Sequence, residues 1–182
     1  MLDLIIKNGQ CYVEGELKNV DVAISDGKIQ KIGQISEKAL NTIDAKGLTV
    51  LPGCIDTQTH FREPGSTDTE DLHSGSRAAV AGGITAVFEM PNTNPPTSTK
   101  KEFQRKLDLA KNRMYCNYAF YFGATADNAN ELADLKNLEG CCGIKLFAGS
   151  STGNLLVANE KDIDTVFKHS SKVVAVDSEA ED

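Results

Sequence analysis

The sequence contains no long hydrophobic run and no export signal. A membrane-spanning helix needs roughly 18 to 20 uninterrupted apolar residues, and no segment of this chain reaches that length. The N-terminus lacks the successive basic, apolar and small-residue regions of a signal peptide. We therefore expect a cytoplasmic protein that has no membrane partner.

Cysteine pairs and basic patches are also missing. The cysteines form an odd set of five without Cys-x-x-Cys spacing, so we interpret them as buried thiols in a reducing compartment. They are Cys11, Cys54, Cys116, Cys141 and Cys142. A net charge of -7 argues against a nucleic-acid partner, because nucleic acid favours clustered Lys and Arg. We interpret Lys100-Lys101 and Arg105-Lys106 as a solvated helix face.

The patterns that are present divide the chain into two parts. Residues 1–51 read as short alternating strands, and Ser25-Asp26-Gly27 is typical of a β-hairpin turn. From 52 to 182, about five apolar strands alternate with four helical stretches, which predicts a parallel sheet covered by helices. We therefore predict an α/β protein, with a small β-sandwich-like module at 1–51 before a strand–helix domain at 52–182.

The alternation of strands and helices by itself is consistent with two architectures of this sheet. One is an open, doubly wound sheet, and the other is a β/α barrel, which needs eight strands and typically about 250 residues. The first strand is not followed by Gly-x-Gly-x-x-Gly, so a dinucleotide-binding fold has little support.

Polar side chains follow several of the predicted strands. In parallel α/β folds such positions share one edge of the sheet, where functional residues gather. Gln58 and His60 stand two apart on a strand, so they should face the same side, as a His-x-His metal pair does. Gln58, however, offers only a neutral amide oxygen, which is a weak zinc ligand. The other strand-end positions are Asp56, Glu89, Pro91, Asn92, Lys145, Asp177 and Glu179.

Four segments together resemble one enzyme family. They are "DTQTHFREPG", "EDLHSGSRAAVAGGITAVFEMPNTNP", "GIKLFAGSSTG" and "VVAVDSEAED". In this order they resemble dihydroorotase and its cyclic-amidohydrolase relatives, the hydantoinases and allantoinases, which are metal-dependent hydrolases. "FREPG" and "MPNTNP" point to dihydroorotase in particular. The resemblance implies that residues 52–182 form the first five β/α units of an incomplete eight-stranded TIM-type barrel.

The same resemblance assigns roles to individual residues. His60 and Gln58 match the family's His-x-His metal pair, and Asp177 falls where the family has a histidine ligand. Lys145 matches a lysine that many members carboxylate to bridge two metal ions. The typical family holds two zinc ions, and here we expect one ion or none. Without the carboxyl group, Lys145 would be neutral or paired, most simply with Asp177.

The substrate contacts and the proton-transfer group also follow from the resemblance. Arg62 and Asn92 match the groups that hold the substrate carboxylate, and a guanidinium suits a planar anion. The catalytic aspartate of the family would come from a later strand, beyond residue 182. No catalytic residue is therefore assigned, and we expect a truncated chain with weak or no turnover.

Two functions remain open at this stage. The first is the reversible cyclisation of N-carbamoyl-aspartate to dihydroorotate in pyrimidine synthesis, with these small molecules as substrates. The second is a non-catalytic homologue, either a structural partner of aspartate transcarbamoylase or the product of a decaying gene. An incomplete barrel exposes strand edges, so we also expect that the chain self-associates into a homo-oligomer, binds another polypeptide or is poorly stable.

Overall fold

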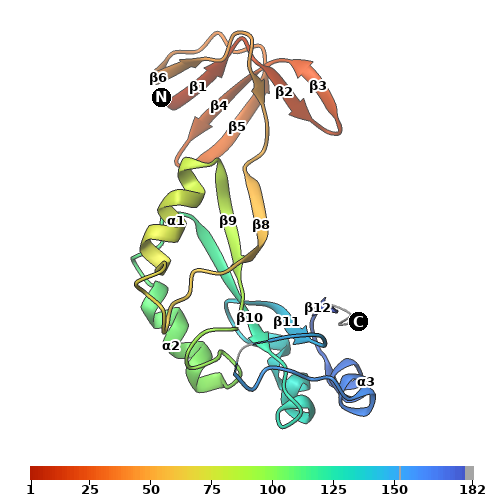
Figure 1. Cartoon of the computed structure of the whole chain (residues 1–182). Coiled ribbons are helices and arrows are strands. Elements are labelled where there is room, and N and C mark those ends of the chain that lie inside the picture. The colour runs from red at the N-terminus through yellow and green to blue at the C-terminus, as the bar shows by residue number, and fades with distance from the viewer. Residues whose placement is uncertain (152, 179–182) are drawn as a thin grey trace. The chain divides into compact units, whose positions relative to one another are not determined.

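A computed structural model of the chain describes residues 1–151 and 153–178 and contains two compact units, Met1–Pro52 and Gly53–Asp182 (Figure 1). No helix in the described part of the chain is both long enough and apolar enough to cross a bilayer. The described cysteines are all unpaired. Cys54 is exposed and Cys116 and Cys142 are half-buried, so the prediction of five buried thiols was wrong for these three.

The first unit consists of β-strands in two sheets. One sheet has the order β5-β4-β1-β6, and the other has the order β3-β2-β7. Asp26 and Gly27 connect β4 to β5 with φ values of 52° and 68°, as the hairpin prediction required. The strands are β1 (Leu2–Lys7), β2 (Gln10–Val13), β3 (Glu16–Asn19), β4 (Asp21–Ser25), β5 (Lys28–Gly33), β6 (Ala39–Asp44) and β7 (Thr49–Val50).

The second unit is a five-stranded parallel sheet in the order β12-β11-β10-β9-β8, with helices between successive strands. The strand order follows the chain order, as it does in a barrel wall. Its elements are β8 (Cys54–Thr59), α1 (Leu72–Ala81), β9 (Ile84–Glu89), α2 (Lys100–Ala110), β10 (Asn117–Gly123), the 3-10 helix η1 (Ala129–Asn137), β11 (Cys141–Phe147), α3 (Glu160–His169) and β12 (Val174–Asp177).

Local sequence explains where the α-helices begin. Asp71 caps α1, because its carboxylate accepts a hydrogen bond from the Ser74 amide at 2.6 Å. Thr99 and Asn159 cap α2 and α3 in the same way. The third of the four predicted helical stretches is instead the 3-10 helix η1. Asn128 does not cap it, since its side-chain oxygen accepts the Thr125 amide at 2.8 Å. Its NH2 group donates to the carbonyls of Ser98 and Gly123.

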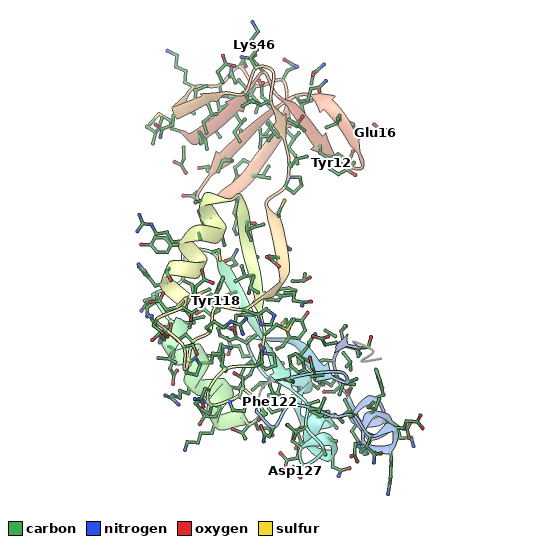
Figure 2. The ribbon with its side chains drawn as sticks, viewed as in Figure 1. Tyr12, Glu16, Lys46, Tyr118, Phe122 and Asp127 are labelled. Atoms are coloured by element: carbon green, nitrogen blue, oxygen red, sulfur yellow. The ribbon has the colours of Figure 1, made fainter. Side chains whose placement is uncertain are left out.

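The main hydrophobic core of the second unit includes side chains from the sheet and its helices. Phe103 of α2 packs edge-to-face on Phe120, with ring centroids 6.3 Å apart, and also packs against Phe122. Figure 2 shows the side chains along the ribbon and labels Phe122. The packing fixes the strand ends, from which the loops that carry the candidate residues emerge.

Candidate functional site

The candidate site lies on the loops that follow β8 and β9. The two loops are joined by a backbone hydrogen bond, in which the Asn94 amide donates to the Pro64 carbonyl at 2.9 Å. Between them lies a pocket of about 330 Å³. Its lining residues are Arg62, Ser66, Asn92, Thr93, Asn94, Pro96 and Gly153. Both residues predicted to hold a carboxylate, Arg62 and Asn92, therefore line one pocket.

His60 lies beside this pocket and contacts Asn92. Its Nδ1 lies 2.9 Å from Asn92 Oδ1. A carbonyl oxygen only accepts hydrogen bonds, so Nδ1 carries the proton and Nε2 keeps its lone pair. The same geometry leaves the NH2 group of Asn92 as a donor for a ligand.

The surroundings of His60 favour its neutral form. Burial lowers the pKa of His60 below its ordinary value, and the Asn92 hydrogen bond partly opposes this. The positive charges of Arg62, Lys145 and Lys106 lower the pKa further. The site thus places the guanidinium of Arg62 near a neutral imidazole, which suits an anionic ligand.

Lys145 and Asp177 form a second pair at the ends of β11 and β12. Lys145 Nζ lies 3.9 Å from Asp177 Oδ2 and 5.0 Å from the centroid of the Phe147 ring. Lys145 is only 2% exposed, and burial lowers its pKa, while the Asp177 charge opposes the shift. The ion pair that the sequence left as one alternative for Lys145 is therefore present.

The donors expected to bind zinc do not assemble into a complete site. Gln58 is exposed, and its backbone amide donates to Asp56 Oδ1 at 3.0 Å. Within residues 1–151 and 153–178, no group of three or more His, Cys, Asp or Glu side chains could hold a metal ion. His60 supplies one imidazole, and the Asp177 carboxylate lies beside an ammonium group. These donors do not fit zinc as they stand. Glu179, another strand-end residue, lies outside the described residues.

Sequence reasoning misjudged Lys106. This residue is completely buried on α2, not part of a solvated face, and forms an ion pair with Glu89. Its Nζ also donates to the Met90 carbonyl at 2.9 Å. Burial raises the pKa of Glu89 to about 7, although Lys106 opposes the shift. Helical spacing was the sequence feature that indicated the burial of Lys106, because Phe103, Lys106 and Ala110 share one buried stripe.

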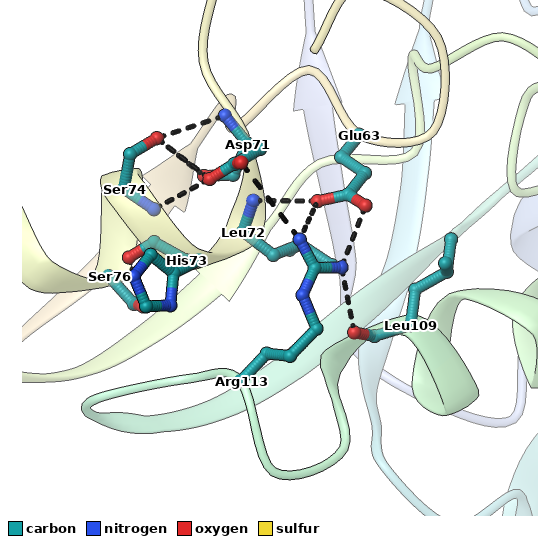
Figure 3. A network of polar contacts seen from close by, with 8 residues as sticks. All are labelled: Glu63, Asp71, Leu72, His73, Ser74, Ser76, Leu109 and Arg113. Carbon is teal, nitrogen blue, oxygen red and sulfur yellow. Dashed lines mark hydrogen bonds and ion pairs between the residues drawn. The ribbon is translucent and has the colours of Figure 1, made fainter.

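The sequence also gave no indication that Arg113 contacts the loop after β8. Arg113 Nη1 donates to Glu63 Oε1 at 2.8 Å and Nη2 to Oε2 at 3.1 Å (Figure 3). Glu63 follows Arg62 directly in this loop, and its partner comes from fifty residues further along the chain. A pairing at that separation leaves no local pattern in the sequence.

Comparison with known proteins identifies relatives of the chain. Over 149 residues it is 41% identical to an allantoinase of Salmonella choleraesuis, covering 81% of this chain and 33% of the relative. Over 163 residues it is 39% identical to a dihydroorotase of Methanosarcina mazei, covering 88% and 35%. The chain thus spans about a third of the length of these relatives.

A solved structure agrees with the fold described above. The L-hydantoinase (dihydropyrimidinase) of Arthrobacter aurescens superposes with a TM-score of 0.89 at 28% identity, covering 100% of this chain and 42% of the hydantoinase. This confirms the predicted α/β class, a β-module with part of a TIM-type barrel, over the open doubly wound sheet.

The family assignment rests on a model of the amidohydrolase family that matches residues 49–176. Members of this family generally use metal ions. The resemblance to cyclic amidohydrolases is therefore confirmed at the level of the superfamily, by relatives that include dihydroorotases, allantoinases and hydantoinases. The chain belongs to the amidohydrolase family.

Proposed function

We propose that this chain carries the carboxylate-binding half of a dihydroorotase site, for the reversible cyclisation of N-carbamoyl-aspartate to dihydroorotate. The observation that supports this most directly is the pocket that Arg62 and Asn92 line together, with His60 hydrogen-bonded to Asn92. Dihydroorotate binds here with its carboxylate on Arg62 and on the NH2 group of Asn92.

The charge of the pocket favours dihydroorotate over the substrates of the other relatives. Dihydroorotate carries a carboxylate beside its cyclic amide, whereas allantoin and simple hydantoins are uncharged rings. A guanidinium pairs with a planar carboxylate through two parallel hydrogen bonds, a geometry that a neutral ring does not offer. Arg62 therefore selects the acid.

The proposed roles of the remaining residues follow from their protonation states. His60 is neutral and keeps the Nε2 lone pair free to accept a hydrogen bond or to bind a metal ion. Lys145 lies beside Asp177 and, in its uncharged form, is the residue that would be carboxylated. Zinc on His60, Gln58, Lys145 and Asp177 remains a prediction.

The experiment is to measure turnover in both directions on the purified chain, with zinc and bicarbonate present. A Gln58→His/Asp177→His variant, which restores two histidine ligands, should turn over faster than the natural chain. Allantoin and hydantoin serve as alternative substrates. Conversion of either one without any conversion of dihydroorotate would contradict the proposal.

Substrate binding is tested separately from turnover. Dihydroorotate should bind in a calorimetric titration, and Arg62→Gln should weaken its binding by about tenfold or more, because a charge-assisted hydrogen bond contributes roughly 1.5–3 kcal/mol. Asn94→Ala, also in the pocket, is the matched control and should change binding less. Equal binding by the natural chain and Arg62→Gln would rule out Arg62 as the carboxylate site.

The ion pair of Lys145 with Asp177 supports a second candidate, a non-catalytic homologue that acts as a structural partner of aspartate transcarbamoylase. In this form the two residues neutralise each other. Sedimentation with purified aspartate transcarbamoylase tests this function. Co-sedimentation together with absent turnover would favour it, and a stoichiometric transition metal in the purified chain would count against it.

A further inference from the structure

The loop that presents Arg62 is anchored from outside the pocket by the side chains on either side of it. Phe61 and Glu63 are 5% and 7% exposed. Phe61 packs on α1 so closely that a Cβ atom at Gly75 would lie 2.4 Å from its Cδ1. Arg62, between the two buried anchors, lines the pocket.

Arg62 adopts a backbone conformation that needs this support. Its φ is 59°, in the left-handed region, where an L-residue other than glycine is strained. The Ser66 amide donates to its carbonyl at 3.0 Å. If an anchor were lost, the residue would relax towards negative φ, and its guanidinium would leave the pocket.

Glu63 is an anchor that joins three segments of the chain. Its carboxylate accepts the Leu72 amide at 2.9 Å, at the positively polarised start of α1, and binds both Nη atoms of Arg113 (Figure 3). Arg113 Nη1 also donates to the Leu109 carbonyl at 3.0 Å, near the end of α2. A bidentate pair fixes the direction of the carboxylate as well as its distance.

We propose that Arg113 is a positioning residue that holds Arg62 ready for a ligand carboxylate. It acts through Glu63, since it does not line the pocket itself. The inference rests on the proposed function in so far as dihydroorotate is the ligand. The anchoring of the loop itself depends only on the contacts described.

The test compares Arg113→Gln with Arg113→Lys and with Arg105→Gln as the matched control. Arg105 lies on α2, whereas Arg113 follows that helix. The Arg105 side chain is 52% exposed and, among the described residues, pairs with nearby Glu102 at 3.3 Å. The dissociation constant for dihydroorotate is measured by calorimetry, well below the melting temperature of each variant. Amide hydrogen exchange is measured at Ser66 and Asn94, whose amides bond to Arg62 and Pro64.

Arg113→Gln should weaken dihydroorotate binding by roughly tenfold to a hundredfold, because a small displacement of a positioned group is costly. It should also speed exchange at both amides. Arg113→Lys, which keeps the charge but loses the bidentate geometry, should give intermediate values. Arg105→Gln should match the natural chain.

The outcomes separate this inference from the proposed function. If Arg113→Gln only lowers the melting temperature, with binding and exchange equal to the control, the positioning role is overturned. If the natural chain binds no dihydroorotate, the proposed function fails. Amide exchange then still decides the role of Arg113. Faster exchange in Arg113→Gln, with a smaller increase in Arg113→Lys, supports the positioning role, and unchanged exchange overturns it.

Discussion

The two buried lysines of the described residues occupy contrasting environments within one sheet unit. Lys106 is 0% exposed, beside a Glu89 that is 1% exposed, and also donates to a backbone carbonyl. Lys145 is 2% exposed, but its partner Asp177 lies 3.9 Å away with a side chain that is 30% exposed.

The difference shows that the cost of burying a lysine depends on how exposed its partner is. Burial lowers the pKa of both lysines. Lys106 and Glu89, the closed pair, are both enclosed by protein, so removing one of them leaves an uncompensated group in the core. Lys145 and Asp177, the open pair, border solvent through Asp177, so the loss of either charge costs less free energy.

Breaking the closed pair should have the largest effect. Lys106→Met should lower the free energy of unfolding by about 3 kcal/mol, because Glu89 is left buried without its partner. Lys145→Met should lower it by less than about 1 kcal/mol, since water reaches Asp177. Urea unfolding followed by circular dichroism at 222 nm measures both variants, because the described helices all lie in the second unit. Equal losses would remove the distinction between the pairs.

The pH dependence of stability should sharpen the same contrast. The pKa of Glu89 is raised from 4.5 to about 7, so the folded chain keeps a proton that the unfolded chain releases between these values. This contribution to stability is complete below pH 4.5 and is lost as pH rises through about 7, a change of about 3 kcal/mol.

Glu89→Gln tests this dependence, because its side chain does not titrate. The difference in unfolding free energy between the natural chain and Glu89→Gln should therefore change between pH 4.5 and 7. The control is Asp177→Asn, which should follow the natural chain over this range. A pH-independent difference for Glu89→Gln would contradict the raised pKa.

The smallest expected effect concerns the open pair. The charge of Asp177 raises the pKa of Lys145, against the larger effect of burial. Asp177→Asn should therefore lower the pKa of Lys145 and increase its neutral fraction at a given pH, with a change in stability below about 1 kcal/mol. The rate at which an amine-selective reagent labels Lys145, read by mass spectrometry, measures this. Lys106 in the same digest is the internal control, and a slower rate at Lys145 would overturn the prediction.

Local features of the sequence were sufficient for most of the fold. The hairpin at Asp26 and Gly27 and the alternation of strands and helices were predicted, because turn chemistry and periodicity depend on neighbouring residues. The 3-10 conformation of η1 was not predicted. Asn128, which precedes η1, donates its side-chain amide to Ser98, thirty residues earlier in the chain, and such a contact leaves no local pattern in the sequence.

For the candidate site, the sequence by itself determined which polar residues follow which strand, and so that Arg62 and Asn92 would share one edge of the sheet. Only the tertiary structure decided the pairing of Glu89 with Lys106 and of Glu63 with Arg113. For Lys145 it selected the pair with Asp177 from the alternatives that the sequence had left open. The physical reason is the range of each interaction. Backbone periodicity is set by adjacent residues, whereas the cost of burying a charge depends on a partner that folding brings from elsewhere in the chain.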